Sequence, residues 1–215
     1  MRRMILAAAV LLALAIAAPV HAGPIFDGAY ITVTMTGVGN TSGGEFLIQG
    51  ANGSVFDPFY SFCLQTNEHL DSPTGIYKAT ITTYAELEPD SPDNKDPLDE
   101  RSGYIYTNYS GTYGGRFVGP GAADAKAHAV QFAIWYIENE VPLNYLDDDA
   151  LYLVDWAENA TSFGSARVLN LTWMNAQGQT VYAQDVLAAV PEPGSMFLLG
   201  TGLVGLAKLA RRRRS

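Results

Sequence analysis

The chain contains a single cysteine, Cys63, which makes it the first candidate for chemistry. It stands in the segment YSFCLQ and cannot form an internal disulfide, because the other 214 of the 215 residues include no cysteine. A lone cysteine is commonly a buried thiol that packs as a small apolar residue. It can also pair between molecules, act as a catalytic thiolate, or form a covalent bond to an atom that is not sulfur.

A glutamine in a helical segment is the second candidate. Gln131 stands in VQFAIW, in the part of the chain with the clearest helical pattern. A thiol held against a carboxamide can expel ammonia and form a thioester, and enforced contact contributes up to about 7–11 kcal/mol in well-oriented cases. His128 lies one helical turn earlier and is a candidate general base, with a surface histidine as the alternative.

The two candidates resemble the reactive pair of thioester domains in bacterial surface adhesins. In that family a Cys follows an aromatic residue early in the domain, and a Gln stands later in a helical motif similar to Q-x-A-I-W. Here Cys63 follows Phe62, and Gln131 is followed by Ala133, Ile134 and Trp135. The resemblance implies an internal thioester that reacts with amines on a partner surface, and a β-rich fold with a helical portion.

Two features bear on this hypothesis. The aromatic neighbours Phe62, Phe132 and Trp135 are expected to limit hydrolysis by excluding water. Val130 stands where many family members have Thr, and the stalk repeats and Gram-positive wall-sorting motif usual in the family are absent. The expected molecule is a single-turnover covalent reagent and not an enzyme.

Two alternatives stay open. In the first, the protein is a non-reactive structural or carbohydrate-contacting matrix protein, and Cys63 is inert. In the second, it is a Cys/His hydrolase or transamidase that uses Cys63 and His128. The G-x-S-x-G, H-E-x-x-H and P-loop motifs of other enzyme classes are missing from the sequence.

The first 22 residues predict a cleavable secretory signal peptide. Arg2 and Arg3 are followed by an apolar run over residues 4–18, and small residues precede the expected cleavage after Ala22. A retained membrane helix is disfavoured because the run is short and ends at Pro19. We therefore expect the rest of the chain to be exported.

Residues 191–215 form a second segment with three parts. Pro191, Glu192 and Pro193 are followed by an apolar stretch over residues 196–210 and then by four arginines, Arg211, Arg212, Arg213 and Arg214. As a helix this stretch spans roughly 22 Å, short of the roughly 30 Å of a bilayer core, so it predicts a weak C-terminal transmembrane anchor. The arginines are expected to stay cytoplasmic, which leaves the preceding domain on the far side of the membrane.

This tail resembles a PEP-CTERM sorting signal. The resemblance implies recognition and removal of the tail by an exosortase-type enzyme in the inner membrane of Gram-negative bacteria. It also implies a transient membrane-anchored intermediate and a final place at the cell surface or in the extracellular biofilm matrix. An ordinary C-terminal anchor is the alternative.

The residues between these segments, 23–190, predict one α+β domain, a β-rich sandwich or barrel-like fold with an inserted helical portion. Val130, Ile134, Ile137 and Val141 repeat at helical spacing, and Pro142 follows them. The predicted helices cover residues 122–140 and 148–158. The predicted strands cover residues 28–37, 45–49, 55–64, 75–84, 166–174 and 180–187, with a hairpin at each end of the series.

The charge of this domain excludes one class of partner. It carries 21 acidic and 6 basic residues, a formal charge of −15 against −9 for the whole chain. Nucleic acid is therefore not an expected partner, because phosphate binding needs clustered Lys and Arg. Two acidic clusters, at residues 90–99 and 147–149, lack EF-hand spacing and are expected to be solvated loops, so neither a metal nor a cofactor is predicted.

Overall fold

A computed structural model describes residues 23–39, 44–86 and 93–190 of the chain. The predicted signal peptide and the whole predicted sorting tail lie outside these residues. Within them, two blocks of antiparallel strands enclose a helical stretch in the order of the sequence. The described part of the chain is therefore a mixed fold of helices and a mostly antiparallel sheet, as the sequence predicts.

The main sheet has six strands in the order β3-β2-β1-β4-β7-β8, and every neighbouring pair is antiparallel. Alternation of apolar and polar residues decides which face is buried, because successive side chains of a strand point to opposite faces. Ala79, Leu171 and Ala183 lie in one buried row across three strands. The strands are β1 (Tyr30–Met35), β2 (Phe46–Gly50), β3 (Phe59–Ser61), β4 (Ile76–Thr82), β7 (Ala166–Met174) and β8 (Thr180–Ala189).

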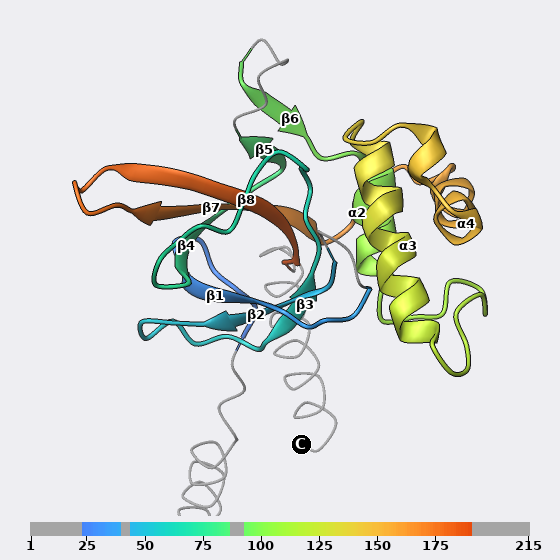
Figure 1. Cartoon of the computed structure of the whole chain (residues 1–215), viewed down its shortest axis with the longest axis horizontal. Helices are drawn as coiled ribbons and strands as arrows, with labels where there is room; N and C mark the ends of the chain where they lie inside the picture. Colours follow the sequence, from blue (N-terminus) through green and yellow to red (C-terminus); the bar gives the residue numbers. More distant parts are fainter. Residues whose placement is uncertain (1–22, 40–43, 87–92, 191–215) are drawn as a thin grey trace, which may run out of the picture.

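The two edge strands of this sheet meet, so the sheet is curled (Figure 1). Beyond β3, the Leu64 N–H donates to the Asp185 carbonyl at 3.0 Å, and the Leu187 N–H donates to the Phe62 carbonyl at 3.1 Å. Cys63 forms an isolated bridge with Val186 between these bonds. The segment that contains Cys63 therefore joins one edge of the sheet to the other.

The helices gather on one side of the curled sheet, with α3 between α4 and the sheet (Figure 1). Each of α2 and α4 is preceded by an aspartate, Asp99 or Asp147, whose side chain accepts from a backbone N–H of the first turn. The helices are α2 (Glu100–Thr107), α3 (Ala122–Ile137) and α4 (Asp148–Ala157), with a short 3₁₀ turn η1 at Leu143–Tyr145.

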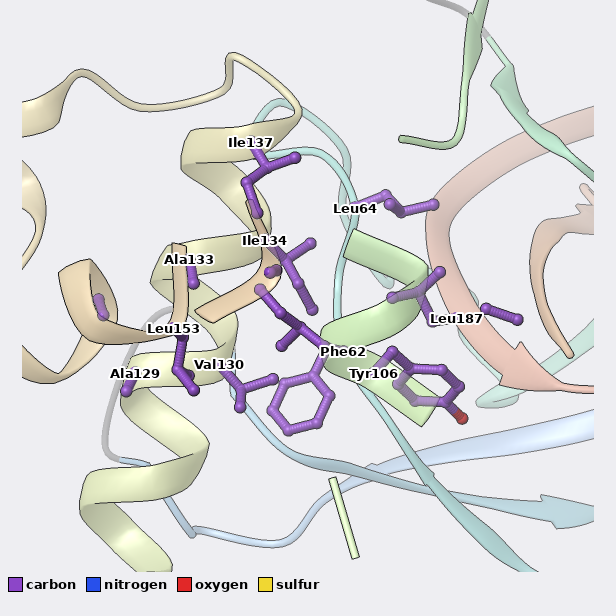
Figure 2. Close-up of a cluster of buried hydrophobic side chains, with 14 of the residues drawn as sticks. Phe62, Leu64, Tyr106, Ala129, Val130, Ala133, Ile134, Ile137, Leu153 and Leu187 are labelled. Atoms are coloured by element: carbon purple, nitrogen blue, oxygen red, sulfur yellow. The ribbon is translucent and has the colours of Figure 1, made fainter. Parts of the chain in front are cut away.

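A cluster of buried side chains holds α3 against the sheet. Figure 2 shows Phe62, which follows β3, and Leu187 of β8 in one cluster with Val130 and Ile134 of α3 and Leu153 of α4. All five side chains are fully buried. This packing fixes the position of α3 relative to the segment after β3, and so sets the geometry of the candidate site.

Most of the predicted elements are present, with two differences. Both predicted hairpins form, as β1–β2 and β7–β8, and the predicted helices appear as α3 and α4. The long helix ends at Ile137 and not at residue 140, because Asn139 has a positive φ of 64° that a helix does not accommodate. The strand predicted at residues 55–64 is shorter, since its middle changes partner from β2 to β8.

Three elements were not predicted. Helix α2 and the small hairpin of β5 (Tyr84–Glu86) and β6 (Lys95–Pro97) lie in or beside the stretch expected to be an acidic loop. Part of that stretch, residues 87–92, lies outside the described residues. No helix in the described ranges is long and apolar enough to cross a membrane.

Candidate functional site

Cys63 and Gln131 meet in the interior of the domain. The Cys63 N–H donates to Gln131 Oε1 at 3.0 Å, and Gln131 Nε2 donates to the Cys63 carbonyl at 2.9 Å. Gln131 is fully buried, and Cys63 is 3% exposed. One carboxamide thus satisfies both backbone polar groups of the residue that carries the thiol, which places its carbonyl carbon beside Cys63.

The local structure explains why a glutamine is needed here. The backbone groups of successive residues in a strand face opposite sides, so Phe62 and Leu64 bond to β8 while Cys63 faces away from it. Pairing between β2 and β3 has ended at Ser61, so no strand pairs with the backbone N–H and carbonyl of Cys63. Gln131 projects from α3 and takes the place of the missing strand.

A pocket of about 440 Å³ borders the thiol-bearing residue. Four segments form its walls: the chain from Cys63 to His69, the C-terminal half of α3, the stretch that leads into η1, and strand β8. The lining residues are Cys63, Gln65, Thr66, Glu68, His69, Phe132, Trp135, Glu140, Val141, Pro142, Tyr145 and Gln184. The pocket gives a small reactant a route from solvent toward Cys63.

Two lining residues carry buried polar atoms without partners. Neither Oε1 of Gln65 nor Nε1 of Trp135 has a hydrogen-bond partner among the described residues. Gln65 is 2% exposed and Trp135 is 7% exposed. Unpaired buried polar atoms are rare, since each costs about 1–3 kcal/mol. The unpaired acceptor and the unpaired donor therefore belong to two residues that line the same pocket.

The electrostatics of the pocket are negative. Glu140 Oε2 accepts from the N–H and the hydroxyl of Thr66, both at 2.7 Å, and Glu68 Oε2 accepts from the Asp185 N–H at 3.0 Å. Burial raises the pKa of Asp185 well above its usual range, and the nearby charge of Glu68 raises it further. None of the lining residues is Lys or Arg.

The thiol itself is held in the protonated form. Burial raises the pKa of Cys63 far above its ordinary value, and the charge of Glu68 adds to this shift. A thiolate poised by a histidine partner, as in Cys/His hydrolases, has the opposite shift. The environment therefore suits a neutral sulfur, either a thiol or a sulfur bonded to carbon.

The structure places the other predicted site residues in two groups. Phe132 and Trp135 line the pocket, whereas Phe62 points into the core on the helical side, where its ring meets Tyr109 edge to face at 4.8 Å. Ala133 and Ile134 are fully buried in that same core. Of the aromatic residues predicted at the site, the two on α3 therefore line the pocket, where Tyr145 of η1 adds a third ring.

His128 does not line the pocket. Its Nε2 lies 3.6 Å from Asp147 Oδ2, and its ring packs against Phe132 with centroids 4.6 Å apart. His69 is the histidine at the pocket, and its carbonyl accepts from the Gln184 N–H at 3.2 Å. The role of general base assigned to His128 stays a prediction, and the placement favours His69 over it.

The predicted site residues leave out most of the pocket lining, including four side chains that carry chemistry: Gln65, Glu68, His69 and Glu140. Three of them lie within six residues after Cys63, so their closeness in the sequence was an available signal. Glu140 follows the end of α3 and carried no such signal.

The acidic clusters have structural roles where they are described. Asp99 caps α2 and pairs with Arg101 at 2.7 Å, and Asp149 pairs with Arg116 at 2.5 Å. Within residues 23–39, 44–86 and 93–190, no group of three His, Cys, Asp or Glu side chains is placed to hold a metal ion.

A buried carboxyl just after α3 makes stability depend on pH. Glu138 is 8% exposed, its Oε1 accepts from the Asp99 N–H at 3.3 Å, and burial raises its pKa to about 8. The folded state therefore holds a proton on Glu138 that the unfolded state releases at about pH 4.5. The free energy of unfolding is therefore highest below about pH 4.5, where Glu138 is protonated in both states. It falls as the pH rises toward 8, because the unfolded state then releases the proton that the folded state keeps.

We expect Glu138→Gln to remove this pH dependence. At about pH 8.5 the variant should be more stable than the wild type by roughly 2–4 kcal/mol, and at about pH 4.5 the two should be similar. Urea denaturation at both pH values measures the difference. An equal gain at both pH values would show that the carboxyl does not titrate in this range.

The comparisons with known proteins bear on the C-terminal tail. A family model described as the PEP-CTERM protein-sorting motif matches residues 189–214. No curated protein and no solved structure matches the chain. The match defines a class: an exported protein that is sorted by an exosortase-type enzyme and passes through a membrane-anchored intermediate.

Proposed function

We propose that the exported domain forms an internal thioester between Cys63 and Gln131 and uses it to attach covalently to amines at the cell surface or in the extracellular matrix. The observation that carries this proposal is the buried pair of hydrogen bonds between the Gln131 carboxamide and the Cys63 backbone. The contact joins residues 68 positions apart and lies beside a pocket. The similarity to thioester domains of bacterial adhesins supports the same pairing.

Formation of the bond needs no reactant beyond the two side chains. The Cys63 sulfur attacks the Gln131 carbonyl carbon, the C–N bond breaks, and ammonia leaves with the proton of the thiol. Two groups held in contact react as one molecule, which removes the entropic cost of bringing them together. Helix α3 and the edge of the sheet provide this constraint through the core between them.

The environment favours the product over the free thiolate. Burial penalises a charged sulfur, as the raised pKa of Cys63 indicates, but a thioester carries no charge. Phe132 and Trp135 line the pocket, and we expect their rings to restrict water at the site. The bond is therefore expected to persist until an amine enters the pocket.

We assign Trp135 as a hydrogen-bond donor to the acyl oxygen. Gln131 Oε1 already accepts from the Cys63 N–H. Trp135 lies one turn after Gln131 on α3 and lines the same pocket, and its buried indole N–H has no partner among the described residues. Negative charge develops on this oxygen during acyl transfer, and two fixed donors stabilise it. An amine then forms a C–N bond at Gln131, the C–S bond breaks, and the sulfur takes a proton from the nitrogen.

Methylamine tests this chemistry. We expect the wild-type protein treated with methylamine to yield a Gln131 peptide that is one CH₂ heavier, together with one newly alkylatable thiol at Cys63. Mass spectrometry of tryptic peptides checks both changes. The Gln131→Glu variant keeps the shape of the side chain and should give neither change. An unmodified Gln131 peptide, with a thiol that alkylates equally before and after methylamine in denaturant, would contradict the proposal.

One alternative is favoured by the same contact. In a non-reactive matrix protein, Gln131 serves as a hydrogen-bonding clasp that completes the edge of the sheet, and both ends of its amide are satisfied in that role. The Cys/His hydrolase has less support, because the pKa of Cys63 is raised and His128 pairs with Asp147.

A further inference from the structure

We propose that the pocket beside Cys63 recognises its amine as an alkylammonium cation, through Glu68, Glu140 and Gln65. This inference rests on the proposed function and names the class of group that enters: a primary amine on an unbranched alkyl chain, as in a lysine side chain. Neutral nucleophiles of the same size fit the pocket, but we expect them to bind more weakly than the cation.

The pocket is lined by acidic side chains. Glu68 and Glu140 both line the pocket, and the lining includes no Lys or Arg. The charge of Glu68 reaches into the site, because it contributes to the raised pKa of both Cys63 and Asp185. A cation is the ligand that relieves this excess of negative charge in a partly desolvated space.

A pocket-lining residue, Gln65, also has a hydrogen-bond acceptor that lacks a donor. Gln65 is 2% exposed, and its Oε1 has no hydrogen-bond partner among the described residues. Its carbonyl is already held by Gln184 Nε2 at 2.8 Å, and its own Nε2 donates to the Glu86 carbonyl at 3.3 Å. The backbone carbonyl and the amide nitrogen of Gln65 are thus held, while its amide oxygen lacks a donor. Gln65 lines the pocket, and an ammonium bound there supplies this donor.

Another part of the pocket wall is aromatic and apolar. Phe132, Trp135 and Tyr145 give the pocket aromatic sides, beside Val141 and Pro142. Such a wall covers methylene groups, and aromatic faces attract a cation as well. The pocket thus offers aromatic rings to the alkyl chain and carboxylates to the nitrogen, and Cys63 lines the same pocket.

The recognised cation must lose a proton before it reacts. A pocket carboxylate takes one proton from the ammonium, and the neutral amine then attacks the acyl carbon. The C–S bond breaks, and the departing sulfur takes the second proton from the nitrogen. The products are an amide at Gln131 and a free thiol at Cys63, with the carboxyl returning its proton to solvent.

The test uses the full chain with Cys63→Ser, which lacks the reactive sulfur and reports binding alone. The probes are n-butylamine and its neutral counterpart 1-butanol, titrated by NMR at neutral pH. We expect butylamine to bind about tenfold more tightly than butanol, since hydrogen bonds to charged groups are the stronger ones. Added salt should reduce the preference, and Glu68→Gln with Glu140→Gln should abolish it.

The outcomes separate the two proposals. Equal binding of butylamine and butanol overturns the cation pocket, whether or not the wild type carries a thioester. A strong preference for butylamine in a protein whose wild type keeps its full mass upholds the pocket and overturns the thioester. If the double variant does not fold, the salt dependence in Cys63→Ser decides: a preference that salt leaves unchanged overturns recognition by charge.

Discussion

Replacing Gln131 by alanine should destabilise the domain by about 3–5 kcal/mol relative to Cys63→Ala. Both variants lose the proposed thioester, so the difference between them reports the hydrogen bonds and the packing of the Gln131 side chain. Cys63→Ala keeps those bonds, because they go to the backbone of residue 63. Gln131→Ala leaves a buried N–H and a buried carbonyl unpaired and opens a cavity next to the core.

Denaturation of the two variants under the same conditions measures this effect. Gln131→Glu is a useful third variant, since it keeps the volume and one acceptor for the Cys63 N–H but loses the donor to the Cys63 carbonyl. We expect its stability to fall between those of the other two. If Gln131→Ala and Cys63→Ala unfold at the same denaturant concentration, the clasp between α3 and the sheet edge contributes nothing.

Trp135→Phe should slow the reaction of the protein with methylamine about 100-fold. The substitution removes the buried indole N–H of a pocket-lining residue, which has no partner among the described residues. Loss of one donor to a developing oxyanion typically costs this much. The release of the Cys63 thiol over time gives the rate. The thioester should still form, more slowly, so the protein must be assayed after its formation is complete.

Two controls separate hydrogen bonding from packing. Phe132→Leu alters the same wall without removing a donor, and we expect its rate to stay within a few-fold of the wild type. Replacement of Trp135 by benzothienylalanine keeps the shape of the ring and lacks the N–H. A wild-type rate for that variant would show that Trp135 acts only by packing.

The pairing of Cys63 with Gln131 was predictable because both residues carry a recognisable local pattern. The apolar period of residues 130–137 places α3 with one face in the core, and the lone cysteine limits the partners to consider. The rest of the pocket comes from loops. Glu140 reaches Thr66 only because the chain turns at Asn139, and that turn is set by a single backbone conformation.

Helix α2 shows the limit of local patterns most clearly. Its sequence, ERSGYIYT, has a glycine and aromatic residues that individually disfavour a helix. The glycine is required by a tertiary contact, because a Cβ on Gly103 would lie 2.2 Å from the Cβ of Phe163. The helix thus depends on a partner about 60 residues away, together with the cap from Asp99. Periodicity within one segment contains neither contact.

The sorting tail, in contrast, could be predicted from its local sequence alone. Its three parts are contiguous, so the order of motif, apolar stretch and arginines was sufficient to predict a PEP-CTERM signal, and the family match over residues 189–214 confirms it. The tail can therefore be identified from the sequence without knowledge of the fold. The thioester requires the whole domain, which is why it stays a proposal that direct chemistry must test.

The intact mass of the exported protein is the most direct test of the thioester. The wild type and Cys63→Ser are purified in parallel from the same host, without exposure to amines, so that processing at both chain ends cancels in the comparison. The thioester predicts a wild type that is lighter than expected by one ammonia, after the exchange of sulfur for oxygen is taken into account. A difference between the two masses that equals the sulfur-for-oxygen exchange alone would contradict it.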